Sequence, residues 1–201
     1  MPGAAISTRQ IQHPFTHFLG TTFLKLVGWT VDDRLPDDPK MVVVYAPHTS
    51  NWDFVYMLAA AYALDLHPNW MGKKELFWGP MNWIFKKLGG ISVDRSTKSN
   101  VVEQTAEAIR AGEGIILGIA PEATRSKASY WRSGFYHIAR LAGVPVHFAY
   151  LDYPSKTAGI APGFTPSGDP DADMPIIQKF YQDKMGKYPQ EMGEIRFKPK
   201  E

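Results

Sequence analysis

His48 and Asp53 are the residues whose types and spacing are best suited to chemistry. They bracket a polar stretch, Pro47-His48-Thr49-Ser50-Asn51-Trp52-Asp53, which follows an apolar run. Histidine is the side chain best matched to proton transfer near neutral pH, especially when a carboxylate holds its opposite ring nitrogen. A loop and the start of a helix can bring Asp53 back to His48. The alternative is a loop histidine beside an aspartate that only caps the helix, and spacing alone favours this simpler reading.

A second segment, Gly89-Gly90-Ile91-Ser92-Val93-Asp94-Arg95, places a charged pair at the end of a short apolar run. The planar guanidinium of Arg95 suits a phosphate group. A surface ion pair between Asp94 and Arg95 explains the segment equally well.

A third segment, Ile119-Ala120-Pro121-Glu122-Ala123-Thr124-Arg125-Ser126, gathers several polar side chains in one tight loop. Glu122, Thr124 and Arg125 could together bind a phosphate and an adjacent hydroxyl. A capping loop at the start of a helix is the structural alternative.

Alternating strands and helices must position these loops, since β-branched runs alternate with stretches of helical composition. We expect strands at 41–46, 70–72, 91–93, 115–119, 144–151, after Pro154 and at 194–198, with helices at 53–65, 76–88, 99–111, 133–142 and about 174–185. This order predicts an α/β fold with a central, mostly buried sheet flanked by helices. Function in such sheets sits where strands end in loops.

Length and composition predict one globular unit. The chain has 201 residues, of which 44% are hydrophobic and 21% charged. We expect a short N-terminal helical extension over 1–40 and a main domain over 41–201. The net charge of +2 is too small to favour a nucleic-acid partner.

The chain contains no cysteine, which excludes disulfides, thiolate metal sites and a cysteine nucleophile. The histidines outside the first segment have no metal-ligand pattern, so we expect no metal and no cofactor. No secretory signal is recognisable. No apolar run of about 18–20 residues exists either, so we expect a protein that is soluble or lies on a membrane without crossing it.

Two stretches are candidates for that membrane contact. Residues 77–87 carry aromatic side chains followed by Lys86 and Lys87, which suits a helix at the headgroup level of a bilayer. The same aromatic residues could equally be core. Residues 15–29 are a second candidate with the same alternative.

Four blocks in order resemble those of the glycerophospholipid acyltransferase family, which includes the 1-acylglycerol-3-phosphate acyltransferases. The blocks are His48-x4-Asp53, Gly90-x-x-Val93-Asp94-Arg95, Pro121-Glu122-x-Thr124-Arg125-Ser126 and Val144-Pro145-Val146, and Lys73-Lys74-Glu75-Leu76 also looks like the family's pattern. The resemblance spans about residues 41–151, most of the chain.

The resemblance implies a role for each block. His48 would be the general base that deprotonates an acceptor hydroxyl as it attacks a thioester, and Asp53 would orient it. No covalent acyl-enzyme is needed, in agreement with the missing cysteine. Acceptor-binding candidates are Arg95, Glu122, Thr124, Arg125 and Lys73. Acyl-binding candidates are Phe77, Trp83, Val144 and Pro145.

The implied partners are acyl-CoA or acyl carrier protein, a lysolipid acceptor and the membrane surface, with a cytoplasmic location on the membrane's inner face. Two departures bear on the acceptor. Ala123 stands where the family usually has glycine, and Ala120 where an aromatic or large apolar residue is usual. They leave open an inactive lipid-binding protein, and His48 could also activate water in a thioester hydrolase.

Overall fold

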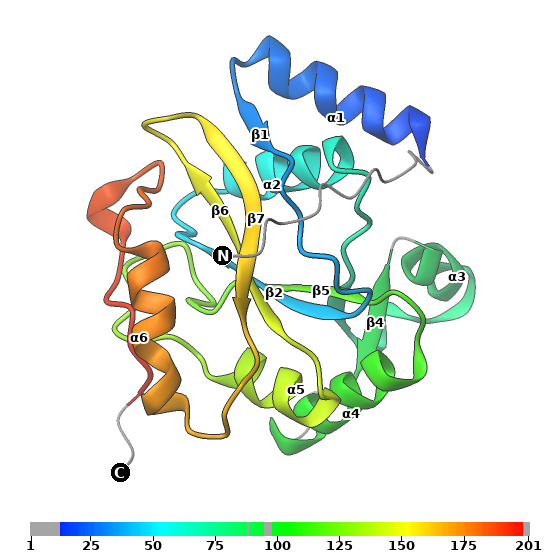
Figure 1. Ribbon diagram of the computed structural model, residues 1–201. Helices are drawn as coiled ribbons and strands as arrows, with labels where there is room; N and C mark the ends of the chain where they lie inside the picture. Colours follow the sequence, from blue (N-terminus) through cyan, green and yellow to red (C-terminus); the bar gives the residue numbers. More distant parts are fainter. Residues whose placement is uncertain (1–12, 88, 95–97, 199–201) are drawn as a thin grey trace.

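A computed structural model describes residues 13–87, 89–94 and 98–198 (Figure 1). A five-stranded sheet lies at its centre, in the order β1-β7-β6-β2-β5. Its strands are β1 (Thr30–Asp32), β2 (Met41–Ala46), β5 (Ile116–Ile119), β6 (Val146–Asp152) and β7 (Thr157–Phe164). The helices are α1 (Pro14–Leu26), α2 (Trp52–Ala63), α3 (Gly79–Lys87), α4 (Lys98–Ala111), α5 (Gly134–Ala142) and α6 (Pro170–Tyr181). The predicted α/β fold with a central flanked sheet is confirmed.

Strand β2 is the middle of the parallel part of this sheet. Val44 is level with Ile119 of β5 on one side and with Phe148 of β6 on the other. Strands β6 and β7 pair antiparallel. The β-branched run of β2 suits a strand that is buried on both faces.

Asn69 joins a smaller sheet to the edge strand β5. Its backbone N–H donates to Ile116 O at 2.7 Å, its carbonyl accepts from Gly118 N, and its Oδ1 accepts from Ile116 N at 3.1 Å. The two parallel strands of the smaller sheet, β3 (Trp70–Lys73) and β4 (Gly90–Val93), follow from there. The bridge between Asn69 and Leu117 is parallel, so both sheets run in one direction at this junction.

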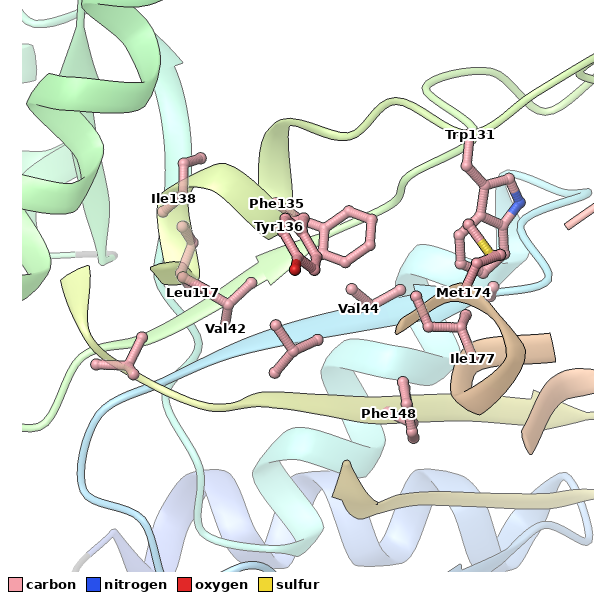
Figure 2. Close-up of a cluster of buried hydrophobic side chains, with 14 of the residues drawn as sticks. Val42, Val44, Leu117, Trp131, Phe135, Tyr136, Ile138, Phe148, Met174 and Ile177 are labelled. Atoms are coloured by element: carbon pink, nitrogen blue, oxygen red, sulfur yellow. The ribbon is translucent and has the colours of Figure 1, made fainter. Parts of the chain in front are cut away.

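The two faces of β2 serve different cores because side chains alternate along a strand. Val42 and Val44 point toward α5 and α6, where they pack with a large cluster (Figure 2). That cluster includes Leu117, Trp131, Phe135, Tyr136, Ile138, Phe148, Met174 and Ile177. Met41 and Val43 face the other way, toward α2.

Helix α1 packs on α2 through Gly20. A Cβ at this position would lie 2.4 Å from Ala59 O, so only glycine allows the two helices to approach this closely. The opposite side of α1 is apolar and exposed, with Phe15, Phe18 and Leu26 each more than half accessible. In the part of the chain that the structure describes, no helix has the length and apolar character needed to cross a bilayer.

Four details differ from the sequence-based expectations. Residues 30–32 form an unpredicted strand, and the predicted helix over 76–88 is divided into a 3-10 turn, η1 (Lys74–Leu76), and α3. The last helix begins earlier than predicted, because Asp169 caps it by accepting from Asp171 N and Ala172 N. The predicted strand over 194–198 is wrong. Phe197 makes a single bridge to Trp131, and its side chain is buried in the core.

Candidate active site

Three neighbouring strand ends build the site. Strands β5, β2 and β6 are parallel and adjacent, so their carboxyl ends reach the same edge of the sheet. His48 follows β2 directly, Glu122 follows β5, and Tyr153 follows β6. The chain therefore places the His48 loop between side chains from both neighbouring strands.

The structure brings His48 and Asp53 together. Nδ1 of His48 lies 3.2 Å from Oδ2 of Asp53, and the two side chains are only 11% and 1% exposed. The N–H direction is not aligned for a hydrogen bond in this conformation. Such bonds are often poorly aligned before substrate binds. With Nδ1 facing the carboxylate, Nε2 is the ring nitrogen left for a substrate.

Asp53 is held by three further donors. Oδ2 accepts the backbone N–H groups of Thr49 and Ser50, each at 2.8 Å, and Oδ1 accepts the hydroxyl of Tyr153 at 2.6 Å. Burial alone would raise the pKa of Asp53, but contacts from His48, Tyr153 and the two amides outweigh it and lower the pKa. The carboxylate closes the turn before α2 rather than capping the helix itself.

Glu122 ties the third segment to the first. Its carboxylate is 8% exposed, and Oε2 accepts the backbone N–H of His48 at 2.8 Å. Burial raises the pKa of Glu122 to about 7, although the hydrogen bond from His48 opposes the rise. Glu122 therefore shapes the loop that carries His48.

Ala123 adopts the left-handed backbone conformation, with φ of +56°. A side chain with a Cβ is strained there, whereas glycine is not. The loop therefore keeps the backbone that a glycine would favour, even though alanine occupies the position.

Two of the remaining acceptor candidates, Thr124 and Arg125, lie on the surface. Thr124 is exposed, and its Oγ1 accepts from Ser126 N at 3.2 Å. Arg125 is exposed and makes no ion pair or hydrogen bond with the described residues. Its charge opposes the rise in the pKa of Tyr45 that burial, Asp53 and Glu122 produce. Arg95 and the side chain of Lys73 lie outside the described part of the structure.

A cavity of about 740 Å³ lies under α2, on the same face of the sheet as Met41 and Val43. Tyr45 connects it to the His48–Asp53 pair, because Tyr45 lines the cavity and its ring meets that of His48 edge-on, with centroids 5.3 Å apart. Other walls come from Val43, Phe54, Met57, Leu58, Leu66, Gly118, Ala149, Gly159 and Ile160. A long apolar group would fit this space better than a polar one.

None of the residues predicted to bind an acyl chain lines this cavity. Phe77 packs against Trp70 and Phe85, and Trp83 is 66% exposed. Val144 is buried in the core on the opposite face of the sheet, while the carbonyl of Pro145 accepts from Val42 N. The alternation of side chains along residues 41–46 could have indicated the cavity wall, because it turns Val43 and Tyr45 away from that core.

A family model described as Acyltransferase matches residues 29–150, which is more than half of the chain. The chain belongs to this acyltransferase family. It is 28% identical over 134 residues to a 1-acyl-sn-glycerol-3-phosphate acyltransferase of Haemophilus influenzae. That alignment covers 60% of this chain and 53% of the relative, so the chain spans about half the length of the curated relative it matches.

The fold also resembles a solved structure. The crystal structure of the 1-acyl-sn-glycerophosphate (LPA) acyltransferase PlsC from Thermotoga maritima superposes with a TM-score of 0.52 and 20% identity. The match covers 85% of this chain and 75% of the other. At 20% identity, this match shows only that the two proteins share a fold.

Sequence reasoning missed the part of the site that follows residue 150. Tyr188 N donates to Thr49 Oγ1 at 3.2 Å, and a Cβ on Gly186 would lie 2.7 Å from the same oxygen. Lys187 places Nζ above the rings of Trp52 and Tyr188, at 5.6 and 5.5 Å from their centroids. No local pattern in the sequence indicates these contacts.

Proposed function

We propose that the protein transfers a fatty acyl group from a thioester, acyl-CoA or acyl carrier protein, to a hydroxyl of a lysophospholipid-type acceptor. The observation that carries this proposal is the His48–Asp53 pair at 3.2 Å, beside an apolar cavity that shares Tyr45 with it. The names of the relatives in Haemophilus and Thermotoga support the same reaction.

In the proposed mechanism Nε2 of His48 accepts the proton of the acceptor hydroxyl as that oxygen attacks the thioester carbonyl. Asp53 faces Nδ1 and stabilises the imidazolium that forms. The tetrahedral intermediate then expels the thiolate, which takes the proton back from Nε2. The ester forms, the thioester bond breaks, and His48 returns to its neutral state.

The acyl chain is proposed to occupy the 740 Å³ cavity. Its walls are mainly apolar, and the small residues Gly118 and Ala149 keep the sheet side of the cavity open. Burial of the chain there is favourable at roughly 25 cal/mol per Å² of apolar surface. This assignment replaces Phe77, Trp83, Val144 and Pro145 as the residues proposed to contact the chain.

The acceptor is proposed to bind at the edge where β5 ends. Arg125 is exposed there as a cation for a phosphate, with Thr124 beside it. Arg95 and Lys73 are kept as further candidates for the same phosphate. Glu122 is proposed to act through the loop of His48, because its Oε2 already accepts from that backbone.

The protein is proposed to act as a peripheral protein at the inner, cytoplasmic face of a membrane. The outer side of α1 is apolar, and Trp78, just before α3, and Trp83, within it, are both exposed. Phe77 and Phe85, by contrast, pack with Trp70. In residues 77–87 some aromatic side chains therefore pack inside the protein, while others are free to contact a membrane. Lys86, Lys87 and His13 border the cavity, which supports entry of the acyl chain from the membrane side.

The test is acyl transfer from labelled acyl-CoA, then from acyl carrier protein, to a panel of lysolipids that includes lysophosphatidic acid. Wild type, His48→Ala and the control His137→Ala are compared. We expect transfer by wild type and His137→Ala and a loss of at least about a hundredfold in His48→Ala. Unchanged transfer by His48→Ala would contradict the mechanism.

Two other outcomes would replace the proposal. Release of free fatty acid at the same rate with and without acceptor would identify a thioester hydrolase. Binding to lysolipid vesicles without turnover on either donor would identify an inactive lipid-binding protein.

A further inference from the structure

Tyr153 makes the shortest side-chain contact to the proposed catalytic pair. Its hydroxyl donates to Oδ1 of Asp53 at 2.6 Å, while Oδ2 of the same carboxylate faces His48 at 3.2 Å. The two oxygens therefore have separate partners. Tyr153 lies beyond residues 29–150, the region that the family model matches.

The fold holds the ring of Tyr153 in place from several sides. Trp29 meets it edge-on with centroids 5.0 Å apart, and Tyr56 lies at 6.1 Å. The backbone N–H of Tyr153 donates to Met185 O at 3.0 Å. These contacts come from segments before β1, in α2 and after α6, so the direction of the hydroxyl is determined by tertiary packing.

The hydroxyl remains a donor through the working pH range. Burial raises the pKa of Tyr153, and the hydrogen bond to Asp53 and the charge of that carboxylate raise it further. The other titratable groups around this pair are His48, Glu122, Tyr45, Tyr56 and Tyr188. A protonated phenol beside an ionised carboxylate is a strong, charge-assisted donor.

Two other tyrosines in the described structure bond to carboxylates without this arrangement. Tyr136 donates to Asp173 at 2.7 Å, and Tyr150 to Asp32 at 3.3 Å. In the described part of the chain neither aspartate has a histidine partner: Asp173 also accepts from Ser167 N, and Asp32 also accepts from Arg34 N. They show what a tyrosine–aspartate bond looks like when it serves the fold alone.

We propose that Tyr153 is a positioning residue for acyl transfer: its hydroxyl fixes the rotation and charge of Asp53 so that Oδ2 stays opposite Nδ1 of His48. The inference rests on the proposed function, in which His48 is the general base. Without the hydroxyl the carboxylate loses the only side-chain donor to Oδ1 among the described residues and is free to turn. It then stabilises the imidazolium less well.

The experiment compares Tyr153→Phe with the matched control Tyr150→Phe, beside wild type and His48→Ala in the same acyl-transfer assay. We expect Tyr153→Phe to lower kcat about tenfold, to leave KM within about twofold, and to move the acid limb of the rate profile to lower pH, because the imidazolium is less well stabilised. Tyr150→Phe keeps wild-type kinetics. Wild-type kcat and an unshifted profile in Tyr153→Phe would overturn the inference.

A double-variant cycle separates positioning from a general effect on the fold. In the Asp53→Asn background the Tyr153→Phe change is expected to have no further effect on kcat, because the carboxylate it acts through is gone. A second tenfold loss would contradict the inference. The Asp53→Asn background also allows the test if Tyr153→Phe alone is unstable, because in that background no buried carboxylate loses a hydrogen-bond donor.

A measurement that needs no turnover separates failure of the proposed function from failure of the role proposed for Tyr153. The carboxyl carbon of Asp53, followed by ¹³C NMR, is expected to titrate at higher pH in Tyr153→Phe than in wild type, and an unchanged titration overturns the inference. Equal activity in wild type and His48→Ala would sink the proposed function. A loss in His48→Ala with an unaltered Tyr153→Phe would sink only the role of Tyr153.

Discussion

The carboxylate of Glu122 accepts the backbone N–H of His48 at 2.8 Å, which joins the loops that follow two neighbouring parallel strands. Glu122 is buried, so this contact orders the peptide that carries the proposed base. The first and third polar segments of the sequence thus meet at one hydrogen bond.

Glu122→Gln is expected to change how stability depends on pH. The folded pKa of about 7 lies above the ordinary value of 4.5, so the folded protein holds this proton more tightly than the unfolded chain. The resulting stabilisation is complete below about pH 4.5 and is lost as pH rises through 7. A neutral glutamine can still accept from His48 N. We therefore expect the variant to gain about 2 kcal/mol over wild type at pH 8 and to show little gain at pH 5, measured by urea denaturation. An equal difference at both pH values would contradict this account.

Ala123→Gly is expected to stabilise the fold. At φ of +56° the backbone strain of an alanine destabilises the folded state by roughly 1–2 kcal/mol. Glycine removes this strain, but its greater freedom in the unfolded chain offsets about 0.5–1 kcal/mol of the gain. The net gain should be about 0.5–1 kcal/mol in thermal or urea unfolding. Ala108→Gly, within α4, is the control and should instead lose about 1 kcal/mol. Destabilisation by both changes would show that the loop needs the methyl group.

Side chains added at Gly118 are expected to shorten the preferred acyl chain. A Cβ at this position would have only Asn69 O nearby, at 3.9 Å, so larger groups extend into the cavity. The series Gly118→Ala, Gly118→Val and Gly118→Leu should progressively favour shorter donors in competition assays with mixed acyl chain lengths. The switch for Gly118→Leu should reach about tenfold, since each buried methylene contributes about 0.8 kcal/mol. A uniform loss at every length would place the acyl chain elsewhere.

Charge reversal on α3 is expected to weaken membrane binding. Lys86 and Lys87 are exposed beside Trp83, with Nζ of Lys87 4.9 Å from that ring's centroid. Each lysine near an anionic surface contributes about 1 kcal/mol. Lys86→Glu/Lys87→Glu should therefore lose at least tenfold in affinity for vesicles containing phosphatidylserine, measured by sedimentation. Lys179→Glu, on α6, is the control. Equal binding by all three proteins would exclude α3 from the contact.

Most helices and strands were predictable from the sequence. The exceptions are segments whose structure depends on pairing with a distant part of the chain. The run 41–46 is β-branched and buried, so its strand was predicted with the correct bounds. Residues 30–32 carry no such run, and their strand depends on pairing with Thr157–Gly159, more than a hundred residues later. Residues 194–198 alternate like a strand, yet among the described residues they pair only through the single bridge between Phe197 and Trp131.

The site was predictable as far as local spacing reaches. Asp53 is close enough in sequence to His48 for a turn to join them, and the parallel order of β2 and β5 brings in Glu122. Tyr153 is a hundred residues from Asp53, and it looks like any other aromatic residue at the end of a strand. The cavity escaped prediction because its walls come from many elements, and its openness depends on small residues such as Gly118.

The contacts of Thr49 with Gly186 and Tyr188 have a consequence for synthesis and for truncation. During translation His48 and Asp53 emerge early, but the loop that carries them cannot close fully until residue 188 has left the ribosome. A recombinant fragment cut at residue 150 would keep the recognisable blocks and lose both Tyr153 and this C-terminal support. The proposed catalytic centre is thus completed only after residues 186–188, well beyond the recognisable blocks, have been made.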